Sequence, residues 1–369
     1  MVRYAGRPTP DWGWQMAAPL ALGEPFGYVH PDRTQHVNYV GDDNHIHELW
    51  WNGPWHHNDL TVAAAAPAPF GQGTVVFGYA HPGDGTQHVN FLGADTHVHE
   101  LWWDGDWHHN DLTVAAAAPN IRAMGVGRGY VHPGDGTQHV IYRGQDRQIH
   151  ELRWAGGWSH HNLTAEAGAP LYKEGPSGGY VHPDGTQHVT FAADDDLIHE
   201  LWWDGRWHHA NLSMAARAPI ATTKPSGGYV SPDGTQHVNY IEFANNHIHE
   251  LWWDGGWHDN DLTDAAGAPP EITPERIRGG YAESNGIQHV DYLGPDNHIH
   301  ELWWDGDWHH RDLSATVAAG ALAEDVGLGY IHPDGTQHVN YLGRGDQHVY
   351  ELWSDNSWHS NDLTLATVD

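Results

Sequence analysis

The sequence predicts an all-β fold, a seven-bladed β-propeller with four antiparallel strands in each blade. Three observations lead to this prediction. The dipeptide Gly-Tyr recurs seven times at intervals of 49 to 52 residues. Each copy contains four short runs of β-branched and aromatic residues separated by turn signals, the pattern of a propeller blade. All seven copies are complete, which favours a closed ring over an open array with capping repeats.

The strands follow one another in the same order in every copy. Gly-Tyr-Val-His is the first, and a Pro-Asp-Gly-Thr turn, as at residues 183–186, leads to the second, Gln-His-Val-Asn-Tyr-Leu. The third is His-Ile-His-Glu-Leu-Trp-Trp and the fourth is Trp-His-His-Asn-Asp-Leu-Thr. Between them lies an Asn-Gly or Asp-Gly pair, the strongest short hairpin signal, which begins at Asn52, Asp104, Asp204, Asp254 and Asp305. The Ala-rich connectors, such as residues 63–66, run directly into proline and show no helical periodicity.

These repeats define the expected domain organisation. The propeller is expected to span residues 27–369, with blades that start near residues 27, 78, 129, 179, 228, 280 and 329. Residues 1–26 precede the first blade. We expect residues 16–26 to act as a connector, and Trp12 and Trp14 to latch the ring.

Composition excludes several partners. The chain has 16 Lys and Arg against 48 Asp and Glu, a formal net charge of −32. Nucleic acids and anionic membranes need clustered cations, so neither is expected as a partner. The absence of cysteine excludes disulfides and thiolate chemistry. No signal peptide or membrane-spanning run is recognised, so localisation is left unassigned, with cytoplasm as the default and release by another route as the alternative.

Strand alternation suggests where a binding site could form. Because successive side chains of a strand point to opposite faces, Glu48 and Trp50 share one face of the first blade, and Leu49 and Trp51 share the other. A cleft between two blades would therefore contain a Glu and a Trp from one blade and a Trp from its neighbour. The alternative is structural: buried His–Glu or His–Asp pairs could simply lock adjacent blades.

The stretch HVNY…HIHELWWDGxW resembles the blade repeat of fungal-type fucose-specific β-propeller lectins. In that family an Arg and a Glu of one blade hydrogen-bond the sugar, and aromatic residues complete a pocket between blades. The resemblance implies a multivalent carbohydrate-binding protein with glycans or glycoconjugates as partners, either fucose-like or another monosaccharide. The carbohydrate-binding residues that it implies are His36, Glu48, Trp51, His88, Glu100, Trp103, His139, Glu151, Trp154, His188, Glu200, Trp203, His237, Glu250, Trp253, His289, Glu301, Trp304, His338 and Glu351.

The chain departs from the family at the position of the arginine. Histidine occupies that position in all seven blades and lacks the two-pronged guanidinium. Arg153 replaces one Trp of blade 3, and Ser354 replaces one of blade 7. Sites formed with these two residues are expected to be weaker or different.

Other functions stay open at this stage. His45, His47, His56 and His57 could form a metal site, as imidazole clusters do, although no spacing is diagnostic. An enzyme is not expected, because recognised catalytic motifs are absent and no blade stands out from the others. No catalytic residue, cofactor or metal ligand is assigned. A protein-interaction scaffold without a sugar site is the remaining alternative.

Overall fold

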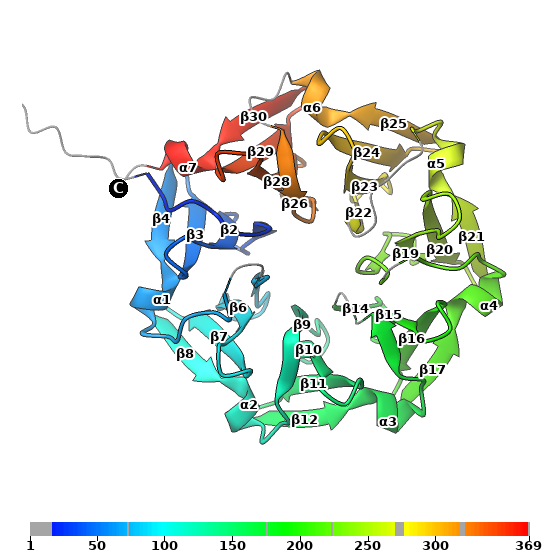
Figure 1. Cartoon of the computed structure of the whole chain (residues 1–369), viewed down its shortest axis with the longest axis horizontal. Helices are drawn as coiled ribbons and strands as arrows, with labels where there is room; N and C mark the ends of the chain where they lie inside the picture. Colours follow the sequence, from blue (N-terminus) through cyan, green and yellow to red (C-terminus); the bar gives the residue numbers. More distant parts are fainter. Residues whose placement is uncertain are drawn as a thin grey trace, which may run out of the picture.

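The fold is a closed ring of seven blades, as predicted (Figure 1). In this computed structural model the described residues are 17–71, 74–174, 176, 178–222, 224–269, 277–317 and 322–367. Trp12 and Trp14, the expected latch, lie outside these residues. Among the described residues no helix has the length and apolar character required to cross a bilayer.

Each blade is an antiparallel sheet whose strands follow the order of the sequence. Blades 1 to 3 contain β1 (Phe26–Val29) to β4 (Trp55–Asp59), β5 (Phe77–Ala80) to β8 (Trp107–Asp111), and β9 (Ile121–Val131) to β12 (Trp158–Asn162). Their middle strands are β2 (Gln35–Val40), β3 (Ile46–Trp51), β6 (Gln87–Leu92), β7 (Val98–Trp103), β10 (Gln138–Gly144) and β11 (Ile149–Trp154).

The remaining four blades repeat this plan. Blade 4 contains β13 (Tyr172–Glu174), β14 (Gly179–Val181), β15 (Gln187–Ala193), β16 (Ile198–Trp203) and β17 (Trp207–Asn211), and blade 5 contains β18 (Tyr229–Val230), β19 (Gln236–Ile241), β20 (Ile248–Trp253) and β21 (Trp257–Asp261). Blade 6 contains β22 (Ile277–Ala282), β23 (Gln288–Leu293), β24 (Ile299–Trp304) and β25 (Trp308–Asp312). Blade 7 contains β26 (Ala323–Val326), β27 (Tyr330–Ile331), β28 (Gln337–Gly343), β29 (Val349–Ser354) and β30 (Trp358–Asp362). Blades 4 and 7 have five strands because two short segments pair with the same second strand.

A short helix follows every blade, which corrects the prediction that Leu-Thr continues the fourth strand and that the connectors are not helical. The seven helices are α1 (Leu60–Ala63), α2 (Leu112–Ala115), α3 (Leu163–Ala167), α4 (Leu212–Ala216), α5 (Leu262–Ala265), α6 (Leu313–Thr316) and α7 (Leu363–Ala366). The Asp or Asn before each helix accepts a backbone N–H of its first turn, as Asp59 does from Val62 at 2.9 Å. This N-cap ends the strand and starts the helix. One turn was too short to leave a helical period in the sequence.

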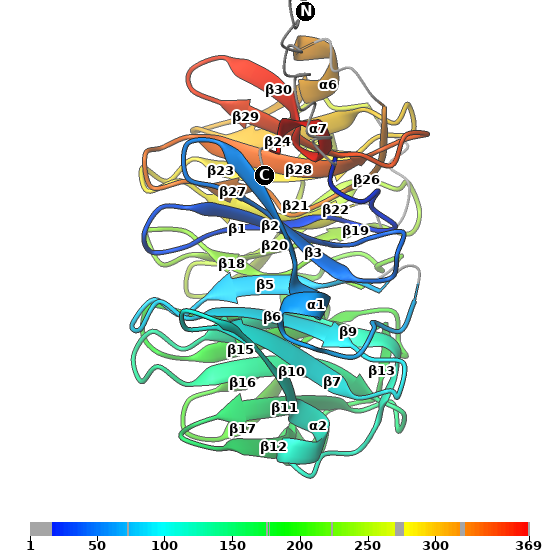
Figure 2. The ribbon, with the colours of Figure 1, turned by 90° about the vertical axis from the view of Figure 1, so that its left-hand side faces the viewer.

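The hydrophobic core is divided among the interfaces between neighbouring blades, which are stacked face to face around the ring (Figure 2). Between blades 1 and 2, Val40 and Ile46 pack with Val89 and Phe91. Between blades 7 and 1, Leu342 and Val349 pack with Val37 and Tyr39. The first and last blades therefore bury their apolar faces against each other, and closure of the ring gives each of them a neighbour.

The recurring Gly-Tyr dipeptide is explained by how closely the blades approach. A Cβ added to Gly78 of blade 2 would lie 2.2 Å from Asn38 Oδ1 and 2.4 Å from Tyr28 Cε1, both of blade 1. Gly27 faces Asn340 and Tyr330 of blade 7 in the same way. Only glycine leaves room for the tyrosine ring of the preceding blade at this position.

We predict that Gly78→Ala lowers the free energy of unfolding by about 1–3 kcal/mol, the usual cost of overpacking. Gly157→Ala is the matched control, because an added Cβ there meets nothing within 4 Å, and its effect should stay within about 0.5 kcal/mol. Denaturant or thermal unfolding of the two variants measures the difference. Equal stability of both would contradict this explanation of the repeat.

Candidate functional site

A buried His–Glu pair lies in every blade. In blade 1, His36 Nδ1 and Glu48 Oε1 are 2.8 Å apart, and the two residues are 3% and 2% exposed. The equivalent distances in the other blades are 2.7–2.9 Å, in the pairs His88–Glu100, His139–Glu151, His188–Glu200, His237–Glu250, His289–Glu301 and His338–Glu351. Each pair joins the second and third strands of one blade. The direct bond of each pair therefore lies within one blade, although Gln337 of blade 7 also reaches Glu301 of blade 6.

The histidine of the pair is engaged at both ring nitrogens. In blade 5, His237 Nε2 lies 2.8 Å from Thr235 Oγ1, while Nδ1 faces Glu250. Asp233 accepts the Thr235 hydroxyl and backbone N–H at 2.7 and 2.9 Å, and these bonds hold the pKa of Asp233 below its usual value. The arrangement orients the histidine and leaves it no free nitrogen for a ligand.

The second oxygen of the glutamate has different partners in different blades. Asn58 donates to Glu48 Oε2 at 3.0 Å, and Asn110 donates to Glu100 Oε2 at 3.1 Å. In blade 5 the hydrogen bonds from His237 and Tyr229 both reach Glu250 Oε1. No described residue donates to Glu250 Oε2.

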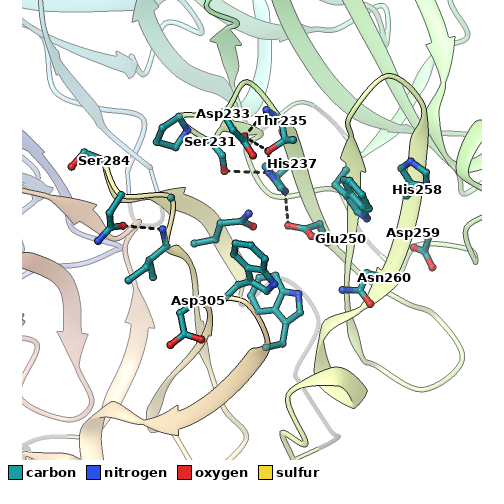
Figure 3. A pocket seen from close by; sticks show the side chains of 18 residues that line it. Ser231, Asp233, Thr235, His237, Glu250, His258, Asp259, Asn260, Ser284 and Asp305 are labelled. Atoms are coloured by element: carbon teal, nitrogen blue, oxygen red, sulfur yellow. Dashed lines mark hydrogen bonds and ion pairs between the residues drawn. The ribbon is translucent and has the colours of Figure 1, made fainter.

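A pocket of about 860 Å³ lies between blades 5 and 6. Blade 5 contributes His237, Glu250, Trp252 and Asn260, and the lining from blade 6 includes Gln288, Trp304, Asp305 and Trp308. Figure 3 shows His237 bonded to Glu250, with Asn260 and His258 on the neighbouring strand of the same blade and Asp305 across the hollow. The pocket thus presents a buried carboxylate among three indole rings, a concave apolar site with a few polar groups.

A substitution in the first turn of blade 5 leaves the mouth of this pocket unbridged. In five blades the histidine of the first turn reaches across to a turn carbonyl of the next blade at 2.8–3.1 Å: His30, His81, His132, His182 and His332. Blade 5 has Ser231 there, and Ser231 Oγ bonds His237 of its own blade at 3.2 Å. An added Cβ on Gly286, the opposing residue of blade 6, would meet nothing within 4 Å. The mouth of the pocket is therefore not spanned.

The third-strand Trp of the prediction lies on the opposite face from the Glu of its own blade. Trp51 packs against the core shared with blade 7, and Trp203 packs against the core shared with blade 3. A pocket therefore combines residues of two consecutive blades, and the structure brings His237 and Glu250 together with Trp304 rather than with Trp253. In blade 3, Arg153 lies 3.8 Å from Asp135.

Two aromatic lining residues are absent from the predicted set. Trp252 shares the face of Glu250, which strand alternation had indicated, and Trp308 belongs to the fourth-strand Trp that precedes a Leu by five positions in every blade. The regular recurrence of Trp308 and its equivalents favoured a packing role. Trp308 both packs against the core and lines the pocket. The lining role could have been recognised only from the position of Trp308 opposite the glutamate of the preceding blade.

The histidine clusters considered for metal binding are built into the fold. Within the described part of the chain, three groups bring a His and two Asp together: Asp43–His45–Asp59, Asp95–His97–Asp111 and Asp296–His298–Asp312. In the first, His45 Nδ1 bonds Asp59 Oδ2 at 2.7 Å, while Asp59 Oδ1 caps α1. The bond to Asp59 raises the pKa of His45. The Asp59 carboxylate therefore bonds the histidine and caps the helix at the same time.

A second set of histidines forms stacked pairs near the outer strands. His300 Nδ1 and His310 Nε2 are 3.1 Å apart, and their rings are stacked. Burial, followed by the neighbouring imidazole, lowers the pKa of His310 below its usual value, and the same causes lower those of His109, His160 and His209. In the folded state these four residues bind protons more weakly than in the unfolded chain.

We therefore expect these four residues to lower stability as the pH drops below about 6.5, the ordinary histidine value. His310→Gln removes one such group but keeps a hydrogen-bonding side chain, so the variant should lose less stability than the parent between pH 7.5 and 5.5. His309→Gln, at a more exposed neighbouring position, is the matched control for the loss of one imidazole. Urea unfolding at both pH values measures this, and an identical loss in H310Q and the parent would contradict the assignment.

Comparison with known proteins identifies similar structures. No family model matches the sequence, and no curated protein matches it. Among solved structures, the BP39L lectin from Burkholderia pseudomallei is similar with a TM-score of 0.64 and 13% identity, over 96% of this chain and 99% of the lectin. AofleA from Arthrobotrys oligospora is similar with a TM-score of 0.55 and 17% identity, over 80% and 88%.

The Aleuria aurantia lectin, a six-bladed β-propeller with a fucose recognition mode, is similar with a TM-score of 0.51 and 14% identity, over 80% of this chain and 95% of the lectin. The identities are too low to carry residue roles across. The resemblance to fucose-specific propeller lectins noted in the sequence is thus confirmed in structure, and the chain shares the propeller fold of these proteins.

Proposed function

We propose that this protein binds carbohydrate and does not catalyse a reaction, with the pocket between blades 5 and 6 as a binding site. The observation that carries the proposal is the pocket itself, in which Glu250 offers a carboxylate oxygen without a protein donor, flanked by Trp252, Trp304 and Trp308. The similar proteins from Burkholderia pseudomallei and Aleuria aurantia are named lectins, which supports this proposal.

The lining groups suit both surfaces of a sugar ring. The indole faces provide flat apolar area for the C–H side of the ring. Glu250 Oε2 can accept hydrogen bonds from sugar hydroxyl groups, and the side-chain amide of Asn260 can both donate and accept them. His237 orients Glu250 and does not touch the ligand, which reassigns the role that the family resemblance gave to the histidine.

Five other interfaces carry related sets of groups behind a bridging histidine. His182, for example, bonds Gly234 O at 3.0 Å above His188 and Glu200. Opening of these bridges would add sites, and several weak sites on one chain would bind a multivalent glycan more tightly than each alone. We propose that fucose is not the preferred sugar, because no guanidinium stands in the place of the family arginine.

Glu250→Gln should weaken sugar binding by about tenfold or more, because a hydrogen bond to a charged group contributes roughly 1.5–3 kcal/mol. Glu100→Gln is the matched control, since Glu100 already accepts from His88 and Asn110 at a bridged interface. A glycan array identifies the sugar, and isothermal titration calorimetry measures both variants. Equal affinities for E250Q, E100Q and the parent would contradict the proposed site, and no glycan binding by the parent would contradict the function.

Ser231→His should close the pocket, because the new imidazole can reach Gly286 O as His182 reaches Gly234 O. We expect sugar affinity to fall at least tenfold without loss of thermal stability. His182→Ser makes the reciprocal change and should open the interface between blades 4 and 5, raising the number of sites per chain. Unchanged affinity in S231H, measured by the same calorimetry, would show that the sugar binds elsewhere.

A further inference from the structure

The interface between blades 6 and 7 contains a cation supplied by the chain itself. Arg311 occupies the fourth-strand position that is Asn in blades 1, 2, 5 and 7. Its Nε donates to Oε2 of Glu301, which is fully buried. The guanidinium carbon lies 4.7 Å from the ring centroid of Trp303 and 5.1 Å from that of Trp358. A planar cation is thus held between a carboxylate and two indoles.

The pocket between blades 5 and 6 contains the same three groups around an empty position. The strand register pairs Glu301 with Arg311 in blade 6 and Glu250 with Asn260 in blade 5. Trp252 is the equivalent of Trp303, and Trp308 is the equivalent of Trp358. Because Asn260 is much shorter than arginine, the carboxylate and both indoles line an open hollow.

The charge of the pocket favours a positive ligand. Its lining includes Asp233, Glu250, Asp259 and Asp305, and no lining residue is a lysine or an arginine. The whole chain has a formal net charge of −32. Glu250 is 3% exposed, and one of its carboxylate oxygens lacks a donor. A ligand with a charged donor therefore forms a stronger hydrogen bond with this oxygen than a neutral ligand does.

We propose that the pocket between blades 5 and 6 binds the protonated amine of an amino sugar. The ammonium group takes the place that the guanidinium of Arg311 takes between blades 6 and 7. It bonds Glu250 Oε2 and lies against Trp252 and Trp308, while the sugar ring packs on Trp304. This inference rests on the proposed carbohydrate-binding function and specifies the class of sugar.

Titration calorimetry with glucosamine, glucose, N-acetylglucosamine and arginine amide tests the inference on the full chain. We expect glucosamine to bind about tenfold more tightly than glucose or N-acetylglucosamine, because only glucosamine carries a charged donor. Asn260→Arg supplies an internal guanidinium, as in blade 6, and should abolish binding. Asn110→Arg adds the same charge at the bridged interface between blades 2 and 3 and should leave binding unchanged.

The reciprocal variant tests the same idea by gain of binding. Arg311→Asn empties the interface between blades 6 and 7, where Glu283 replaces the bridging histidine and bonds His289 instead. We expect this variant to bind one additional glucosamine per chain. Thermal unfolding of R311N shows whether the variant keeps its fold. The binding of N260R is the second measurement, because blade 6 already carries an arginine at this position.

The outcomes separate the two levels of the proposal. Equal binding of glucosamine and glucose, or unchanged binding in N260R, would overturn the amino-sugar inference and leave a carbohydrate-binding function in place. Binding of arginine amide with no binding of any sugar would overturn the proposed function and the sugar class together, while retaining a cation pocket. Loss of glucosamine binding in N110R as well as N260R would show that charge alone, and not the pocket, controls affinity.

Discussion

A buried carboxylate in every blade is the constraint on which the organisation of this propeller depends. A carboxylate removed from water must receive hydrogen bonds. One oxygen of each glutamate is satisfied by a histidine of its own blade, as in the pair His36–Glu48. What reaches the second oxygen varies from blade to blade: an asparagine in blades 1 and 2, Arg311 in blade 6, and no described donor in blades 3, 4, 5 and 7. The chemical character of an interface follows from this second partner.

Two positions break the symmetry of the ring. The first-turn histidine, such as His182, closes the mouth of an interface, and its replacement by Ser231 opens one. The fourth-strand asparagine leaves space beside the glutamate, and its replacement by Arg311 fills that space. The fold tolerates both changes because the strands and the Gly-Tyr packing are unaffected by them. Function can therefore differ between interfaces while the scaffold stays uniform.

The fold could be predicted from the sequence because a comparison of seven copies of one blade shows which residues recur at each position. Gly-Tyr, Gln-His-Val and the Asp-Gly hairpins mark the strands, and alternation correctly placed Glu250 and Trp252 on one face. The short helices could not be predicted because a single capped turn has no period. Accessibility of a site could not be predicted either. Ser231 and Arg311 are visible in the sequence, but their meaning depends on Gly286 and Trp358 of the following blades, contacts that only the ring creates.

The most direct test of the central claim is a crystal structure of the protein soaked with glucosamine. We predict ligand density between blades 5 and 6, with the amine within hydrogen-bonding distance of Glu250 Oε2 and the ring against Trp304. Density at a different interface, or at blades 6 and 7 with Arg311 displaced, would contradict the assignment of the open carboxylate as the ligand site.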